Sequence, residues 1–376
     1  MAELREIRSE DEEGYGRFST GILPSHVLKR LTQAGREVTA DEPIMAAQIQ
    51  PASIDLRLGA KAWRVRASFL PGPHATVEDK LGSVFMHEVD LTQGAVLETG
   101  CVYIVELQER AEFSARISGI ANPKSSTGRI DVFTRLITDR AQSFDRIEPG
   151  YRGPLYAEIS PQTFPALVRK GSRLNQLRIR HGSPQFSDTQ LRRLHADAPL
   201  MDREPDIDNG LGLSIDLKGP GRIGWRAKRH TGLIDVDRPG LLDPYQFWDS
   251  IEATEHGHLV LDPDEFYILA SRERVAIPFD HAAEMVPFNP LVGEFRVHYA
   301  GFFDPGFGYR PGQPPSARAV LEVRSREVPF ILEHGQIVGR LVFERLTDPP
   351  PEGYGAGLGS NYQGQDLKLS KHFRAP

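Results

Sequence analysis

The chain has 376 residues, 39% of them hydrophobic and 26% charged, which is typical of a globular protein with two domains of ordinary size. It has no apolar run long enough for a membrane helix, and a net charge of −6 without a long basic block. Its acidic N-terminal stretch lacks a basic-then-apolar pattern, so we expect no export signal. A single cysteine, Cys101, excludes an internal disulfide and a cysteine zinc cage. We therefore expect a cytoplasmic protein that binds neither membranes nor nucleic acids, and whose cation clusters bind small anions.

Two helices are predicted in a chain that otherwise has short β-rich stretches, such as "CVYIVELQE", separated by many of the 29 prolines and 35 glycines. The first helix covers "LPSHVLKRLTQAG" (23–35), with Ser25 as the expected N-cap and Gly35 as the stop. The second covers "DPYQFWDSIEATEHG" (243–257), with Asp243 as its cap. The pattern predicts a mainly β fold with few short helices.

The segment "PKSSTGR" (123–129), which we call the anion loop, lies between predicted strands. Its hydroxyl and backbone N–H groups can donate to phosphate oxygens, while its two cations neutralise charge. The alternative is a solvated turn. The candidate anion-binding residues are Lys124, Ser125, Ser126 and Arg129.

The second half of the chain repeats the first. The stretch "ASIDLRLGAKAWRVRA" (52–67) returns as "LSIDLKGPGRIGWRAK" (213–228), and "YAEIS" returns as "VLEVR". Three separate matches, Tyr103 with Tyr267, Glu158 with Glu322 and Gly171 with Gly335, share one offset of 164 residues. A tandem duplication of one β-rich unit is therefore predicted.

The repeat sets the expected domain boundaries. The first copy is expected over 1–185 and the second over 208–348. Residues 186–207 are polar and poor in β-forming residues, which is typical of a linker. Residues 349–376 contain a glycine-rich stretch and are expected to close over a ligand.

Glu158 and Glu322 are the candidate catalytic carboxylates. Each lies in an apolar strand pattern shortly after an acidic Pro-Gly turn. Partial burial would raise the pKa of such a carboxyl towards a value useful for proton transfer. Either residue alone could instead face solvent, but their recurrence after the same turn favours function.

Other catalytic motifs have little support. The stretch "GPGRIG" (219–224) fits a dinucleotide fingerprint, but strand-like sequence follows it instead of a helix, so a turn is expected. Histidine and cysteine spacings typical of a zinc deaminase or a metalloprotease are missing, as is a serine nucleophile elbow. His298 is expected to be a structural strand residue.

Taken together, these motifs resemble the deoxycytidine triphosphate deaminase branch of the trimeric dUTPase superfamily, in its double-length fused form. The matching stretches, in chain order, are "KSSTGR", "YAGFFDPGF", "LEV", "HGQIVGRLVFE", Tyr354 and "NYQGQ". The resemblance covers nearly the whole chain, twice. It implies that each copy is a dUTPase-like distorted β-barrel, similar to a jelly roll.

The resemblance implies hydrolytic deamination of dCTP to dUTP and ammonia, which supplies dUTP for dUMP and dTTP synthesis. It implies a glutamate general base and no catalytic metal, with Mg²⁺ entering as a counterion of the triphosphate. Ser125 and Arg129 would orient the attacking water. The residues implied to bind substrate are Lys124 and Ser126 at the phosphates, the backbone of Ala300 at the cytosine, Asp304 at the sugar, and Tyr354 and Gln365 over the triphosphate.

Neither copy carries the complete family pattern. The first has the anion loop but a long, charged hairpin, "LITDRAQSFDRIEPGYRG", and the second has the better hairpin but "PFNPLVGEF" in place of the loop. Because family sites form between subunits, we expect a homo-oligomer and a composite site, with the loop of copy one and Glu322 of copy two. Glu158 stays the alternative, because a closed ring of three cannot alternate two kinds of domain.

Two rival functions remain open at this point. One is a dUTPase, or a bifunctional enzyme that deaminates dCTP and then hydrolyses dUTP. The other is a regulatory module that binds nucleotides without catalysis, because each copy has lost one part of the pattern. Feedback by dTTP is a further open question.

Overall fold

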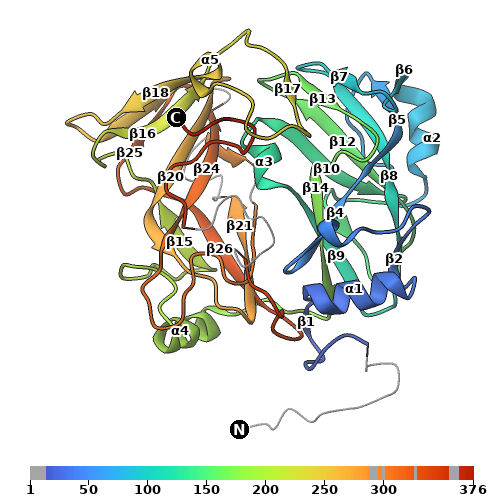
Figure 1. Ribbon diagram of the computed structural model, residues 1–376, viewed down its shortest axis with the longest axis horizontal. Coiled ribbons are helices and arrows are strands. Elements are labelled where there is room, and N and C mark those ends of the chain that lie inside the picture. The colour runs from blue at the N-terminus through green and yellow to red at the C-terminus, as the bar shows by residue number, and fades with distance from the viewer. Residues whose placement is uncertain (1–13, 288–294, 299–300, 326–327, 355–363) are drawn as a thin grey trace.

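The computed structural model describes residues 14–287, 295–298, 301–325, 328–354 and 364–376. Strands dominate, and apart from one small shared sheet the two halves of the chain form their own sets of sheets, which lie side by side in Figure 1. The prediction of a mainly β fold with a duplicated unit is confirmed.

The first half contains two six-stranded sheets. One has the order β11-β9-β14-β4-β3, with β1 on β14, and the other has the order β10-β12-β8-β5-β6, with β2 on β8. The strands of the first sheet are β1 (Gly21–Ile22), β3 (Ile49–Gln50), β4 (Ser53–Leu56), β9 (Ile117–Pro123), β11 (Arg146–Ile147) and β14 (Asn175–His181). Those of the second are β2 (Glu37–Ala40), β5 (Leu58–Val65), β6 (Phe85–Asp90), β8 (Val102–Glu112), β10 (Val132–Thr138) and β12 (Arg152–Pro161).

The second half has a four-stranded sheet, β15-β26-β21-β23, and a five-stranded sheet, β18-β16-β20-β24-β22. The first consists of β15 (Leu211–Ser214), β21 (His281–Pro287), β23 (Phe302–Phe303) and β26 (Ile337–Arg345). The second consists of β16 (Arg222–Ala227), β18 (Trp248–Glu252), β20 (Phe266–Val275), β22 (Phe295–His298) and β24 (Ala317–Ser325). A separate hairpin pairs β19 (His258–Leu261) with β25 (Phe330–Glu333).

The duplication is visible in the strand order. The path β10-β12-β8-β5-β6 of the first half is repeated as β22-β24-β20-β16-β18 in the second. A small third sheet links the halves, because β17 (Ile234–Asp235) pairs in parallel with β13 (Ala166–Val168), which also pairs with β7 (Ala95–Leu97). Residues 219–221 form a bend that leads directly into β16, so the stretch 219–224 is a turn followed by a strand, as the sequence predicts.

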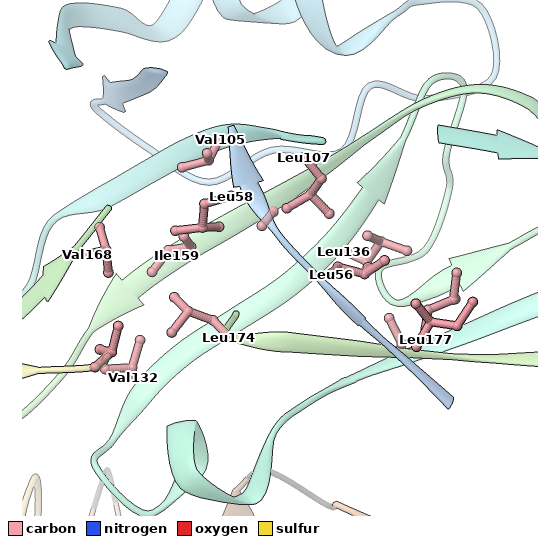
Figure 2. Packing of buried hydrophobic residues seen from close by; sticks show 14 of the residues in the cluster. Leu56, Leu58, Val105, Leu107, Val132, Leu136, Ile159, Val168, Leu174 and Leu177 are labelled. Carbon is pink, nitrogen blue, oxygen red and sulfur yellow. The ribbon is translucent and has the colours of Figure 1, made fainter. Parts of the chain in front are cut away.

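Two large hydrophobic cores support the fold: the first fills the first half and continues into the second through residues such as Trp248, and the second lies mainly in the second half. Figure 2 shows part of the first core, which contains Leu56, Val105, Ile159 and Leu177 from four different strands. All four side chains are fully buried. Each such burial stabilises the fold by about 1.5–3 kcal/mol, so the sheets give the site a rigid support.

The helices are few and short, as predicted: α1 (Ser25–Gln33), η1 (Ala46–Gln48), α2 (Val77–Val84), α3 (Ser125–Gly128), α4 (Asp188–Asp197) and α5 (Pro244–Phe247). Helix α1 lies where the sequence predicts it, but Pro24 is the residue at its N-cap and Ser25 is already helical. None of the helices in the described part of the chain is long and apolar enough to cross a bilayer.

The second predicted helix is wrong beyond its first turn. Asp243 does cap α5, accepting a hydrogen bond from the N–H of Tyr245 at 3.0 Å. The chain then enters β18, which pairs with β16. The indole of Trp248 is fully buried against Phe164, with ring centroids 5.4 Å apart. Tertiary packing therefore overrides the local helical pattern.

The stretch 186–207, expected to be a linker, contains helix α4. Ser187 accepts a hydrogen bond from the N–H of Gln190, and the Gln190 side chain accepts one from the N–H of Ser187. This reciprocal cap satisfies two backbone donors at the start of the helix. Leu191 packs into the second core.

Candidate active site

A cavity of about 340 Å³ lies between the two halves, lined in part by α3, which lies between them in Figure 1. Its walls come from the first half, the second half and the C-terminal segment. The predicted residues that line it are Lys124, Ser125, Ser126, Arg129, Asp304, Glu322, Tyr354 and Gln365. Ala300 lies outside the described residues, and Glu158 is not part of the lining.

The anion loop forms the single turn of α3 between β9 and β10. Lys124 is extended at its N-cap, and the N–H of Lys124 donates to the carbonyl of Leu174 at 2.8 Å. The hydroxyl of Thr127 donates to the same carbonyl at 3.0 Å. These contacts hold the turn against the start of β14, so that Ser125 and Ser126 line the cavity.

One end of the cavity is cationic. Lys124, Arg173 and Lys371 all line the cavity and lie near Asp55. The carboxylate of Asp55 lies among them, ion-paired with Lys124 and 3.6 Å from Nη1 of Arg173. Burial, with Lys124 nearby, lowers the pKa of Lys371. Three cations against one carboxylate make this end suited to a polyanion.

Glu322 lies at the other side of the cavity, on β24 between β20 and β22. It is 3% exposed, and burial raises the pKa of its carboxyl to about 8, an effect that Arg129 opposes. Nε of Arg129 lies 3.7 Å from Oε1 of Glu322. The Nη1 group of Arg129 donates to the carbonyl of Lys368 at 3.0 Å. This carboxyl can therefore exchange a proton near neutral pH.

Asp304 and an apolar wall complete the cavity. Asp304 is buried, and Oδ1 lies 3.2 Å from Nη2 of Arg178, which comes from the first half. Burial raises the pKa of Asp304, and the Arg178 guanidinium opposes the rise. Phe302 and Phe307 add apolar surface suited to a flat ring.

The C-terminal segment supplies Tyr354 and Gln365. The Tyr354 ring packs on Phe307, with centroids 5.7 Å apart. Gly306 has φ of 90°, and a Cβ there would lie 3.0 Å from the Tyr354 nitrogen, so only glycine suits this approach. Gln365 exchanges hydrogen bonds with the backbone of Arg318, at 2.9 and 3.1 Å. Both residues lie over the cavity.

Glu158 has a different environment from Glu322. It accepts a hydrogen bond from Nη2 of Arg135 at 2.6 Å. The Arg135 guanidinium stacks 3.4 Å from the centroid of the Phe144 ring. Arg135 is the residue directly opposite Glu158 on the neighbouring strand, the register position that His298 occupies beside Glu322. Side chains of the first half therefore occupy the space beside Glu158.

Sequence analysis missed three lining residues that carry charge: Asp55, Arg173 and Lys371. Asp55 lies in the repeated motif "SIDL", which was a usable signal. Arg173 lies in the short connection before β14 and Lys371 in a turn near the C-terminus, and neither residue has a distinctive motif for a binding role. Among the described residues, no group of three or more His, Cys, Asp or Glu side chains is arranged to hold a metal ion.

Comparisons with known proteins agree with one another. The N-terminal domain model of the 2′-deoxycytidine 5′-triphosphate deaminase family matches residues 19–183, and the C-terminal domain model of that family matches residues 187–373. A protein of Beutenbergia cavernae named "dCTP deaminase, dUMP-forming" is 30% identical over 180 residues, 44% of this chain and 90% of that protein. A protein of the same name from Mycolicibacterium vanbaalenii is 35% identical over 180 residues, with the same coverage of 44% and 90%.

A solved structure is also similar. The crystal structure of 2′-deoxycytidine 5′-triphosphate deaminase from Agrobacterium tumefaciens has a TM-score of 0.83 and 57% sequence identity to this chain. The match covers 87% of this chain and 99% of that one.

Proposed function

The chain belongs to the 2′-deoxycytidine 5′-triphosphate deaminase family, and on this premise we propose that it deaminates dCTP by hydrolysis in the cavity between its two halves. The observation that carries this proposal is the contact between Arg129 of the first half and Glu322 of the second, in a cavity whose far end is cationic. The triphosphate would occupy the cationic end, with the cytosine towards Glu322.

Glu322 is the proposed general base. It takes a proton from a water molecule as the water oxygen bonds to C4 of cytosine. The carboxyl passes this proton to N3, which takes up the electron pair displaced from its double bond to C4. The hydroxyl now on C4 then gives up its proton through the same carboxylate to the amino group, which leaves as ammonia while C4 becomes a carbonyl. A carboxyl with a pKa of about 8 suits both steps, because it gains and loses a proton near neutral pH.

Arg129 and the hydroxyl of Ser125 are proposed to orient the water. Arg129 is held on one side by the carbonyl of Lys368 and on the other by Glu322, so its guanidinium has little freedom. Ser125 lines the cavity at the start of α3. Fixed donors of this kind lower the barrier because they need no reorganisation during the reaction.

The remaining lining residues are proposed to bind substrate. Lys124 and Ser126 would contact the phosphates, and Asp304 would accept a hydrogen bond from the sugar. Tyr354 and Gln365 would cover the bound nucleotide. The cytosine-reading role expected for Ala300 stays a prediction outside the described residues. Mg²⁺ would enter as part of the substrate, bound to its phosphates.

The proposed product is dUTP. A second candidate arises because the two curated relatives carry the name "dUMP-forming". Release of dUMP would need a second carboxylate to activate water at the α-phosphate. Among the residues that the structure describes, the lining has two further carboxylates, Asp55, ion-paired with Lys124, and Asp304, ion-paired with Arg178. This supports deamination alone for the present chain.

One time course tests the proposal. Purified protein is incubated with Mg²⁺ and dCTP, and ammonia, dUTP, dUMP and pyrophosphate are measured together. We expect equal amounts of ammonia and dUTP. Ammonia with dUMP and pyrophosphate would establish the bifunctional alternative. Binding of dCTP with no ammonia after long incubation would overturn the enzymatic proposal in favour of a regulatory module.

Homo-oligomer formation, inhibition by dTTP and a cytoplasmic location stay predictions.

A further inference from the structure

Two buried ion pairs with opposite polarity join the two halves beside the cavity. Along the first half, the cation Arg129 is followed two residues later by the anion Asp131. Along β24, the anion Glu322 is followed two residues later by the cation Arg324. Nε of Arg129 lies 3.7 Å from Glu322, and Nη2 of Arg324 forms an ion pair with Oδ2 of Asp131. The anion loop of the first half and β24 of the second half therefore carry opposite charges at both contact points, Arg129 with Glu322 and Asp131 with Arg324.

Asp131 is fixed by its own half. Its φ of 55° is left-handed, a conformation that aspartate tolerates better than most residues. Its N–H donates to the carbonyl of Gly128, and its carbonyl accepts from the N–H of Gln162, both at 2.9 Å. The hydroxyl of Thr163 donates to its carboxylate at 2.5 Å. The carboxylate is thus rigidly connected to the anion loop.

Arg324 is fixed by the second half. It is 6% exposed, and its Nη1 group donates to the carbonyl of Asp264 at 2.6 Å. Its Nη2 group donates to the hydroxyl of Thr163 at 2.8 Å, in addition to its contact with Asp131. Residues two apart on a strand share a face, so Arg324 and Glu322 both point towards the first half.

Comparison of the two copies shows that only the strand of the second half can form the ion pair with Asp131. At the offset of 164 residues, Ser160 occupies the position of Arg324 in the first copy. The Ser160 hydroxyl accepts a hydrogen bond from the side chain of Gln162 at 2.8 Å and offers no cation. The strand that carries Glu158 therefore cannot make the same contact with Asp131.

We propose that Asp131 and Arg324 are positioning residues whose ion pair sets the placement of Arg129 against Glu322 and selects the strand of the second half as the partner of the anion loop. This inference rests on the proposed function of Glu322. A buried ion pair adds little net stability compared with apolar residues, because both charges lose their hydration. A displacement of about 1 Å at a reacting group can cost about 100-fold in rate.

The test compares this pair with a matched pair elsewhere between the halves. Arg180 of β14, which is partly exposed, and the buried Glu344 of β26 form an ion pair of 2.6 Å that does not line the cavity. The variants are Asp131→Asn and Arg324→Met on one side, and Arg180→Met and Glu344→Gln on the other. For each, kcat and KM for dCTP, the pH profile and the midpoint of urea unfolding are measured.

We expect Asp131→Asn and Arg324→Met to lower kcat by about 10- to 100-fold with KM nearly unchanged. The pH profile should move upward, because Arg129 no longer lies beside Glu322 to favour its ionised form. Arg324→Lys should recover part of kcat. The control variants should lower the unfolding midpoint by a similar amount while retaining kcat and the original pH profile.

Equal losses of kcat in both sets of variants would overturn the inference, as would full kcat with an unmoved pH profile in Asp131→Asn and Arg324→Met. If the single variants do not fold, the double variant Asp131→Asn/Arg324→Met removes both charges and carries the same expectations.

Glu322→Gln separates this inference from the proposed function. If Glu322→Gln loses turnover while the pair variants keep it, only the positioning role fails. If Glu322→Gln keeps turnover, the general-base role proposed for Glu322 fails.

Discussion

Nε of Arg129, in the loop of the first copy, lies 3.7 Å from Oε1 of Glu322, on β24 of the second copy. In a repeated sequence, equivalent residues such as Glu158 and Glu322, which are 164 positions apart, would normally serve the same role twice. Here each copy supplies one member of a contact inside a single chain. Duplication has therefore allowed the two copies to specialise, and the cavity between them contains both parts.

The pH dependence of turnover follows from the burial of Glu322. Burial raises the pKa of this carboxyl to about 8, and the general base must be ionised to accept a proton. We expect kcat/KM for dCTP to rise by about tenfold per pH unit below this value and to level above it. Initial rates from roughly pH 6 to pH 9 measure the profile. A flat profile across this range would contradict the assignment.

The positive charge of Arg129 opposes part of the rise that burial causes in the pKa of Glu322, and so favours the ionised base. Arg129→Met should therefore raise that pKa further, move the rise in kcat/KM to higher pH and lower kcat. The matched control is Arg173→Met, because Arg173 lines the cavity beside Asp55. It should raise KM without moving the pH profile. Identical profiles for the two variants would count against the contact of Arg129 with Glu322.

Stability should also depend on Glu322. Its pKa is raised from 4.5 to about 8 in the folded state, so between these values the folded protein holds a proton that the unfolded chain has released. Folding stability therefore falls as pH rises through this window, by up to about 1.4 kcal/mol per pH unit. Glu322→Gln should be more stable than the original protein at pH near 8, and less different from it near pH 5, by urea unfolding. Glu333→Gln, at an exposed position on β25, is the control. A stability difference independent of pH would contradict the burial argument.

Lys124 is expected to act in binding more than in chemistry. Its ammonium group is ion-paired with Asp55 at the cationic end of the cavity. Lys124→Ala should raise KM for dCTP while changing kcat little, and should weaken the dependence of KM on salt. Lys170→Ala, which removes an exposed lysine ion-paired with Glu42 at 2.6 Å, is the control and should leave KM unchanged. A loss confined to kcat would contradict a phosphate-binding role.

The sequence was informative where chemistry is local and repeated. The anion loop, Glu322, Asp304 and the C-terminal residues Tyr354 and Gln365 were all identified from short motifs, and the fold brings them to one cavity. Their individual roles stay predictions. The duplicated β fold was predictable because a repeat offset survives divergence of the residues between its motifs.

Long-range contacts explain what could not be predicted. The motif around Glu158 matches that around Glu322, and only cross-strand packing by Arg135 and the ring of Phe144 distinguishes their environments. The helical pattern after Asp243 fails because Trp248 is required in the core. Local sequence contains neither constraint.

Comparison of Glu322→Gln with Glu158→Gln tests the composite site most directly, with ammonia release from dCTP measured at a temperature where circular dichroism shows both variants folded. We predict that Glu322→Gln loses about 100- to 10,000-fold in kcat, the range for loss of a general acid–base group, while Glu158→Gln stays active. Full activity in Glu322→Gln together with loss of activity in Glu158→Gln would contradict the composite site.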